Sequence, residues 1–293
     1  LGVDFLALSF VRRAGDIDAL RRLIKKSGLP APAIIAKIEK PEAIDNINEI
    51  MTATDAIMVA RGDLGVELSP ETVPAFQDQL IDLAQQHRKP VIIATQMLES
   101  MINCPRPTRA EASDVATAVR AGVDAVMLSG ETAVGLYAVE AVRMMDQIAR
   151  QTEAHQWQSG FFGSLAQNDQ IKRPLPTADA VAEAAARLSR DLMVRAIVAV
   201  SMNDRSVDVI SASKPAAPVI GLSVDGRVSC KNNLLWGVIP VTAGKEDLEA
   251  PLRFVRHITR ELGLAEEGQK CLVIQGFTTD PEYRAPNITV VTV

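Results

Sequence analysis

Short apolar runs alternate with amphipathic stretches through the first half of the chain. Each run is apolar on both faces, which is typical of a strand buried in a parallel sheet. The stretches between the runs have helical spacing: Pro74 to His87 places Leu80 and Leu83 on one face, and Thr108 begins a capping box with Glu111. The five runs are Phe5 to Phe10, Ala33 to Ile38, Ala56 to Ala60, Val91 to Thr95 and Ala125 to Ser129. This alternation predicts a parallel α/β sheet over residues 1–155.

A second α/β pattern follows a break in the periodicity. Residues 156–176 contain four Gln and two Pro and lack an apolar period, which predicts a linker. Apolar runs and helical stretches alternate again from 177 to 293, without an evident repeat of the first half. We therefore expect a second domain over residues 177–293, built as an open α/β sheet.

Polar residues stand where the apolar runs of the first half end. Parallel α/β folds bind their ligands at the carboxyl ends of the strands, in barrels and open sheets alike. Five consecutive units with polar residues at these ends favour a (β/α)8 barrel, of which only five strands are present. The residues at these ends are Ser9, Lys37, Glu39, Arg61 to Asp63, Thr95, Gln96 and Ser129 to Glu131.

Composition and charge narrow the classes of function. Of the 293 residues, 47% are hydrophobic and 23% are charged, which is ordinary for a folded chain. The 31 Lys and Arg residues against 36 Asp and Glu give a net charge of −5, which argues against a nucleic-acid binder. No apolar run approaches the ~20 residues that span a membrane, so we expect no membrane partner. The three widely spaced cysteines argue against a disulfide framework, and a reducing cytoplasm fits them.

Lys37 and Glu39 form the first candidate site. Residues i and i+2 of a strand face the same side, so both side chains project together unless the strand has already ended before Glu39. A lysine in this place can neutralise a developing oxyanion while the carboxylate holds a metal ion. The alternative interpretation is a surface ion pair at a strand end.

Two further candidates follow the third and fourth strands. Val59 to Gly65 predicts a loop in which Gly62 lets backbone N–H groups approach a ligand and Asp63 binds a hard cation. The alternative is a tight turn with a solvated aspartate. Thr95 emerges from an apolar strand and could equally cap the helix that follows. Residues 126–133 could equally form an ordinary strand-to-helix turn.

These candidates gain specificity when they are taken together. Glu39 and Asp63, from successive strands, would supply two oxygen ligands for Mg²⁺, which completes its coordination with waters and substrate oxygens. Lys37 would stand beside the ion as a cation for an enolate or phosphoryl oxygen. Backbone N–H groups after the third strand would bind a carboxylate.

Five motifs in this order resemble those of the pyruvate kinases. They are KIE (37–39), ARGDLGVE (60–67), ATQMLESM (94–101), PTRAE (107–111) and VMLSGETA (126–133). The resemblance is close from the start of the chain to about Glu153, and the C-terminal half resembles the family's regulatory domain in layout. It implies a partial (β/α)8 barrel carrying the family's fourth to eighth strands, followed by an open α/β domain. The first three strands and the inserted lid domain would precede Leu1.

The resemblance also implies a reaction in which phosphoenolpyruvate gives its phosphoryl group to ADP, yielding pyruvate and ATP in glycolysis. Mg²⁺ or Mn²⁺ would bridge Glu39, Asp63 and the substrate. Lys37 would neutralise charge on the transferring phosphoryl group. Backbone N–H groups at Gly62 and Asp63 would hold the substrate carboxylate. Thr95 would help to deliver a proton to the enolate carbon through water.

Other positions have less specific roles by the same resemblance. Ser9 would orient Lys37. Arg205 and Ser206 occupy the place of an effector loop, but Asp204 replaces that loop's usual glycine. The two residues could still bind an anion at a helix start, and a helix cap by Asp204 or Ser201 is the alternative.

The resemblance also implies that the complete enzyme requires K⁺, whose usual ligands are not in this chain. It further implies an allosteric, cytoplasmic enzyme that assembles as a homotetramer. Two alternatives stay open. One is a Mg²⁺-dependent aldolase or lyase acting through a pyruvate enolate, which would need a similar pair of acids. The other is a non-catalytic fragment, because the chain begins inside an apolar run. We expect the 293-residue chain to lack activity by itself, since an incomplete barrel cannot close.

Overall fold

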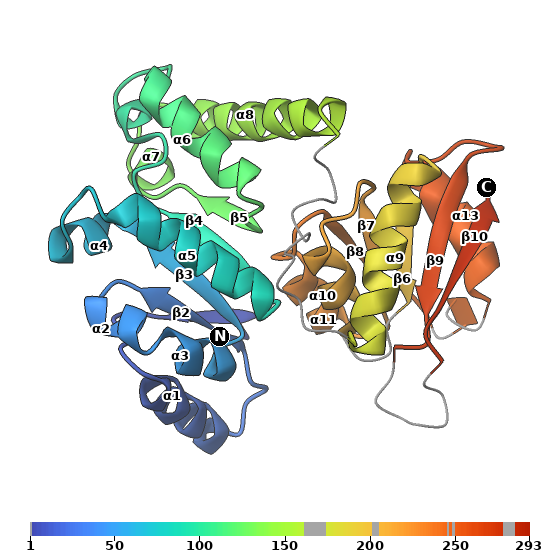
Figure 1. Ribbon diagram of the computed structural model, residues 1–293, viewed down its shortest axis with the longest axis horizontal. Helices are drawn as coiled ribbons and strands as arrows, with labels where there is room; N and C mark the ends of the chain where they lie inside the picture. Colours follow the sequence, from blue (N-terminus) through green and yellow to red (C-terminus); the bar gives the residue numbers. More distant parts are fainter. Residues whose placement is uncertain (1, 161–173, 201–204, 245, 248–249, 278–284) are drawn as a thin grey trace. The chain divides into compact units, whose positions relative to one another are not determined.

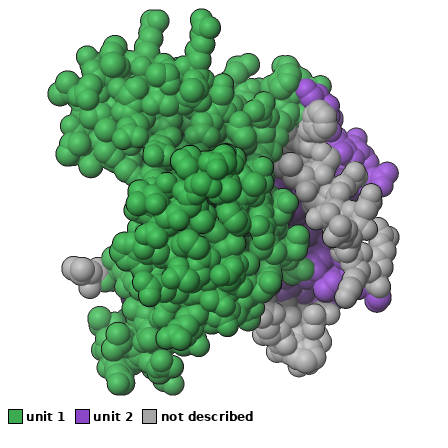
Figure 2. Space-filling view, turned by 60° about the vertical axis from the view of Figure 1, so that its left-hand side comes forward, with its two compact units in different colours: residues 1–158 green, residues 159–293 purple. Residues whose placement is uncertain are grey.

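The chain forms two compact units, residues 1–158 and residues 159–293, which Figure 2 colours separately. Figure 1 shows the computed structural model with its helices and strands labelled. The structure describes residues 2–160, 174–200, 205–244, 246–247, 250–277 and 285–293.

The first unit is built on a five-stranded parallel sheet in the order β1-β2-β3-β4-β5. Each strand pairs with the next one along the chain, with Ile38 of β2 opposite Val59 of β3, for example. Sequential order without a reversal is the arrangement of a (β/α)8 barrel, whereas a doubly wound sheet reverses direction at a switch point. The predicted partial barrel is therefore confirmed. Its strands are β1 (Phe5–Leu8), β2 (Ala33–Ile38), β3 (Ala56–Ala60), β4 (Val91–Ala94) and β5 (Ala125–Met127).

Helices follow the strands of the first unit, as the helical spacing predicts. The predicted capping box begins α6: Thr108 Oγ1 accepts a hydrogen bond from the Glu111 N–H, and the Glu111 carboxylate accepts one from the Thr108 N–H. The helices are α1 (Ala14–Ser27), α2 (Pro41–Asp45), α3 (Ile47–Ala53), α4 (Arg61–Glu67), α5 (Val73–Gln86), η1 (Glu99–Ile102), α6 (Arg109–Arg120), α7 (Gly130–Ala133) and α8 (Ala138–Gln158).

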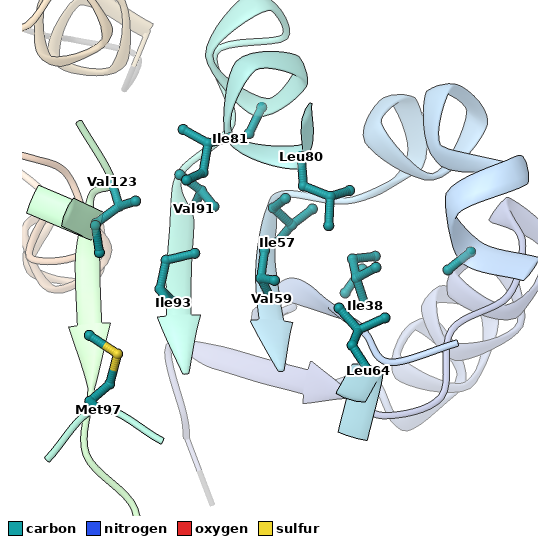
Figure 3. Packing of buried hydrophobic residues seen from close by; sticks show 14 of the residues in the cluster. Ile38, Ile57, Val59, Leu64, Leu80, Ile81, Val91, Ile93, Met97 and Val123 are labelled. Atoms are coloured by element: carbon teal, nitrogen blue, oxygen red, sulfur yellow. The ribbon is translucent and has the colours of Figure 1, made fainter. Parts of the chain in front are cut away.

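A core of buried apolar side chains between sheet and helices holds the first unit together (Figure 3). Leu80 and Ile81 of α5 lie over β3 and β4, where Ile57 and Val91 meet them. All four side chains are at most 2% exposed. Burying such a side chain stabilises a fold by about 1.5–3 kcal/mol. This core fixes the strands, and hence the positions of the segments that follow their carboxyl ends.

The structure corrects one local expectation in this unit. Residues Val59 to Gly65 were expected to form a loop, but α4 begins at Arg61, directly after β3. Asp63 lies in the first turn of this helix, where a negative charge is favoured by the helix dipole. Gly62 is therefore the second residue of α4 and not part of a loop.

The second unit contains a five-stranded open sheet in the order β10-β9-β6-β7-β8. β10 runs antiparallel to β9, whereas the other neighbours are parallel. Buried side chains form one apolar cluster with α9 and α10 and another with α13, as expected for an open α/β sheet. Its elements are α9 (Thr177–Asp191), β6 (Ile197–Val200), α10 (Arg205–Ala212), β7 (Val219–Ser223), α11 (Gly226–Asn232), β8 (Val238–Thr242), α13 (Pro251–Glu261), β9 (Lys270–Gln275) and β10 (Asn287–Thr292).

The linker expected over residues 156–176 stays a prediction. α8 continues to Gln158, into the range 156–176 that was expected to be a linker, and residues 161–173 lie outside the described residues. Within the described residues, no helix is both long enough and apolar enough to cross a membrane.

Candidate active site

Lys37 and Glu39 form an ion pair at the carboxyl end of β2. Lys37 is the last but one residue of that strand, and Glu39 directly follows it. Lys37 Nζ lies 2.5 Å from Glu39 Oε1 and donates a hydrogen bond of 2.9 Å to Ser9 Oγ, just after β1. The structure therefore brings together the three candidates from the first two strand ends.

This ion pair differs from the solvated surface pair that was the alternative. The Glu39 side chain is 1% exposed and the Lys37 side chain 24%. Glu39 Oε2 accepts a second hydrogen bond, of 2.6 Å, from the backbone N–H of Phe10. Burying a carboxylate is costly unless charges and donors compensate it. Lys37 and the Phe10 N–H supply that compensation.

Asp63 is the second carboxylate at this edge of the sheet. It lies in the first turn of α4 and is exposed. Since β2 and β3 are parallel neighbours with Ile38 opposite Val59, Glu39 and the start of α4 leave the sheet at the same edge. The two acids thus follow neighbouring strand ends, as the sequence predicts.

The donor set of this edge fits Mg²⁺ if substrate and water complete the coordination. Among the described residues, no group of three or more His, Cys, Asp or Glu side chains could hold a metal ion. Mg²⁺ commonly takes one or two carboxylates, several waters and substrate phosphate oxygens. Glu39 and Asp63 would be those carboxylates.

Thr95 caps a helix, although not the helix that follows it along the chain. Its Oγ1 accepts a hydrogen bond of 2.8 Å from the Gly62 N–H of α4 and donates one of 2.6 Å to the Ala94 carbonyl. A Cβ at position 62 would lie 3.3 Å from Thr95 Oγ1, so the absence of a side chain keeps this approach open. The Gly62 N–H, expected to hold a substrate carboxylate, donates to Thr95 in this structure.

The backbone at Thr95 and Gln96 is strained. Both residues have left-handed conformations, with φ of 67° and 55°. Such a conformation costs a non-glycine residue about 1–3 kcal/mol, and strain of this kind concentrates at functional sites. Thr95 therefore does not simply end β4, as the apolar run predicts, but turns sharply away from it.

Arg61, a strand-end residue to which the sequence assigns no role of its own, makes hydrogen bonds to this strained turn. Its side chain is 8% exposed, and Nη2 donates hydrogen bonds of 2.9 Å to the Thr95 carbonyl and 3.0 Å to the Gln96 carbonyl. Nη1 lies 2.5 Å from Asp114 Oδ2 on α6. The motif ARGD was the available signal, but the sequence does not show that its arginine turns inward.

Glu131 joins the segments that follow β4 and β5. It is 3% exposed; Oε1 accepts a hydrogen bond of 3.1 Å from the Leu98 N–H and Oε2 one of 2.7 Å from the Ser129 N–H. The motif VMLSGETA thus forms more than an ordinary turn into α7, because its carboxylate fixes a neighbouring segment.

Glu111 fastens the segment after β4 to the start of α6. Its carboxylate accepts hydrogen bonds from the N–H and hydroxyl groups of both Ser100 and Thr108. Burial acts to raise the pKa of Glu111, but these hydrogen bonds outweigh it and hold the pKa below its ordinary value of 4.5.

The suggested effector residues lie in the second unit, at the start of α10. Ser206 is fully buried there, and its hydroxyl has no hydrogen-bond partner among the described residues. Residues 201–204, which include both alternative caps, lie outside the described residues, and so does the Arg205 side chain. The anion-binding role of Arg205 and Ser206 stays a prediction.

Two family models match the chain, one for each unit. The pyruvate kinase barrel domain matches residues 1–142, and the pyruvate kinase alpha/beta domain matches residues 179–291. The chain belongs to the pyruvate kinase family. Membership explains why five sequential strands of barrel type are followed by an open sheet.

Individual pyruvate kinases are similar over most of this chain. One from Agrobacterium vitis is 42% identical over 293 residues, which cover 99% of this chain and 59% of the relative. One from Sporosarcina psychrophila is 46% identical over 244 residues, covering 83% of this chain and 41% of the relative. A crystal structure of a pyruvate kinase from Cryptosporidium parvum matches with a TM-score of 0.89 at 31% identity, covering 99% of this chain and 59% of that chain. The chain thus spans about 41–59% of the length of these pyruvate kinases.

Proposed function

We propose that this chain carries the phosphoryl-transfer site of a pyruvate kinase, which moves the phosphoryl group of phosphoenolpyruvate to ADP and yields pyruvate and ATP. One observation carries the proposal: the buried Glu39, paired with Lys37, leaves the sheet at the same edge as Asp63. Phosphoryl transfer depends on positioning and charge compensation, and this cluster supplies both.

Lys37 is the cation of the proposed site. Ser9 Oγ and Glu39 Oε1 hold its ammonium group from two sides, so it is oriented before substrate arrives. Its charge would stabilise the phosphoryl group during transfer and the enolate oxygen that remains. Bound Mg²⁺ or Mn²⁺, held by Glu39 and Asp63, would neutralise further phosphoryl charge.

Thr95 is the proposed proton-delivery residue. Thr95 follows β4, which is the neighbour of β3 in the sheet. Its hydroxyl therefore comes from the strand end next to the one that precedes Asp63. The backbone N–H groups at Gly62 and Asp63 would bind the substrate carboxylate, which requires that the Gly62 N–H be shared with or released by Thr95.

The remaining expectations extend this proposal to the complete enzyme. We propose K⁺ as a second required cation, a cytoplasmic homotetramer as its assembly, and glycolysis as its setting. We also propose residues 1–155 as the barrel part, 156–176 as a linker and 177–293 as the regulatory domain. Cys104, Cys230 and Cys271 are free thiols, which fits a reducing compartment.

The test compares the 293-residue chain with an extended chain. The extended chain is a fusion of this sequence with the part of the Agrobacterium vitis pyruvate kinase that the match does not cover. The two parts are joined in the order in which they occur in that relative. Both are assayed for pyruvate formation from phosphoenolpyruvate and ADP with Mg²⁺ and K⁺, and Lys37→Met in the extended chain is the control for the site.

We expect turnover from the extended chain, loss of it in Lys37→Met, and none from the 293-residue chain alone. The physical reason is that β1 and β5 each have only one neighbour in the described sheet, so the barrel is not closed. An extended chain that folds without turnover would contradict the proposed function. Turnover by the shorter chain would contradict only the expectation about closure. The aldolase alternative is not supported, because both family models are pyruvate kinase models.

A further inference from the structure

Arg61 connects three segments of the first unit through one buried guanidinium group. From the first position of α4, its Nη2 and Nε donate to the Thr95 carbonyl at 2.9 and 3.3 Å. Nη2 also donates to the Gln96 carbonyl at 3.0 Å, and Nη1 pairs with Asp114 of α6 at 2.5 Å. The fork of donors thus spans the turn after β4 on one side and α6 on the other.

The carbonyl groups that Arg61 binds belong to the two left-handed residues. Thr95 is β-branched, and a β-branched residue with φ of 67° is a rare conformation that its surroundings must maintain. The Thr95 carbonyl belongs to the peptide plane between Thr95 and Gln96, and the Gln96 carbonyl belongs to the next plane, so Arg61 fixes the two peptide planes that follow the Thr95 Cα. The direction of the Thr95 side chain depends on the first of these planes and on the plane before Thr95, which the end of β4 fixes.

The Thr95 hydroxyl is also held from α4 itself. The Gly62 N–H, one residue after Arg61, donates to Thr95 Oγ1 at 2.8 Å. At the start of α4, Arg61 therefore binds the Thr95 backbone carbonyl and Gly62 binds the Thr95 side chain. Displacement of the guanidinium group would release the backbone and turn the hydroxyl away from its place.

We propose that Arg61 is a positioning residue that keeps the Thr95 hydroxyl in its reactive orientation, and that Asp114 acts through Arg61 by fixing the guanidinium fork. The inference rests on the proposed function, because it takes Thr95 as the proton-delivery residue. Arg61 is not a catalytic residue in this scheme, since its donors are directed to the Thr95 and Gln96 carbonyls, to Met97 Sδ and to Asp114. A purely structural ion pair would change stability without changing the proton step selectively.

Asp114→Asn is the decisive variant. It keeps the size of the side chain and removes the charge that orients Arg61; the Asp114 side chain is 36% exposed, so this change disturbs the core less than a change at Arg61. Arg61→Lys is the second variant, because lysine keeps the charge but lacks the fork. Asp146→Asn is the matched control, since Asp146 pairs with Arg150 on the surface of α8 at 2.8 Å.

The proton step is measured in the extended chain by exchange of pyruvate methyl protons for deuterium in D₂O, followed by ¹H NMR with Mg²⁺, K⁺ and ATP present. The methyl group loses a proton to form the enolate, and the enolate then takes a deuteron from solvent. We expect exchange and kcat to fall about 10- to 100-fold in Asp114→Asn and Arg61→Lys, with KM for phosphoenolpyruvate within about twofold. Asp146→Asn should match the parent. The double variant should lose no more than Arg61→Lys alone, because Asp114 acts through Arg61.

A second readout does not depend on activity. Selective ¹³C labelling reports the backbone shifts of Thr95 and Gln96, which we expect to move away from left-handed values in both variants and to stay unchanged in Asp146→Asn. Unchanged shifts, or exchange within about twofold of the parent in both folded variants, would overturn the positioning role. If the parent shows no exchange while the shifts move as expected, the proposed function fails and the positioning of Thr95 stands.

Discussion

The buried carboxylate of Glu131 offers a test of how the segments after β4 and β5 are held. Its two oxygens accept hydrogen bonds from the backbone N–H groups of Leu98 and Ser129 at 3.1 and 2.7 Å. Glu131→Gln keeps the shape of the side chain, but an amide offers only one oxygen and turns its NH₂ group toward the other donor. One backbone N–H is then left buried without an acceptor.

The size of the effect follows from that single lost bond. A hydrogen bond to a charged group contributes about 1.5–3 kcal/mol, and an orphaned buried donor costs a similar amount. We therefore expect the free energy of unfolding of the first unit to fall by about 2 kcal/mol. With an m-value of about 2 kcal/mol/M, the urea midpoint moves down by about 1 M.

Tryptophan fluorescence can report this unit alone. The chain has two tryptophans, and Trp236 lies in the second unit, so Trp236→Phe leaves Trp157 at the end of α8 as the probe. Glu71→Gln is the control, because Glu71 is exposed. A midpoint for Glu131→Gln within about 0.2 M of the parent would show that the carboxylate does not fasten these segments.

Four other changes test the site and its supports. In the extended chain, Lys37→Met should lower kcat by about a thousandfold or more while phosphoenolpyruvate binding persists, because the charge matters most during transfer; near-normal kcat would leave the lysine a structural role only. Asp63→Ala should raise the Mg²⁺ concentration for half-maximal activity by about tenfold or more, and an unchanged metal titration would remove this carboxylate from the metal site. Gly62→Ala puts a methyl group 3.3 Å from Thr95 Oγ1, so turnover should fall about tenfold with little loss of stability; equal turnover would show that this contact is dispensable. The lowered pKa of Glu111 means that its stabilisation is present above its ordinary value of 4.5 and is lost as the pH falls through the lowered pKa. The unfolding midpoint of Glu111→Gln should therefore lie below the parent's at pH 7 and approach it as the pH falls below 4.5 and through the lowered pKa, whereas a constant gap would contradict the assigned role.

The sequence predicts the elements of the first unit well because strand and helix periods are both clear there. The same period of two predicts that Lys37 and Glu39 share a side if the strand continues; β2 ends at Ile38, yet the two side chains are in contact. The burial of Glu39 is not predictable in this way, because it depends on the Phe10 N–H, which comes from a neighbouring strand end. Only the assembled sheet brings the two together.

The missed features are those in which local preference is overruled by contacts elsewhere. Two glycines around Asp63 indicate a loop, yet Thr95 from the next strand caps a helix there. No residue type signals the left-handed turn at Thr95, since threonine avoids it. In the second unit, the buried side of α11 includes Ser229 and Asn232, so this helix has no apolar period that could predict it.

The buried polar links between strand ends limit how this barrel can be remodelled. Arg61 ties the segment after β3 to the turn after β4, and Glu131 ties the segment after β4 to the one after β5. In many barrels each such segment can be exchanged separately, which is how one scaffold acquires new chemistry. Here the replacement of one segment alone would leave a buried guanidinium group or a buried carboxylate without its hydrogen-bond partners. The three segments must be inherited, or transplanted, as a single block.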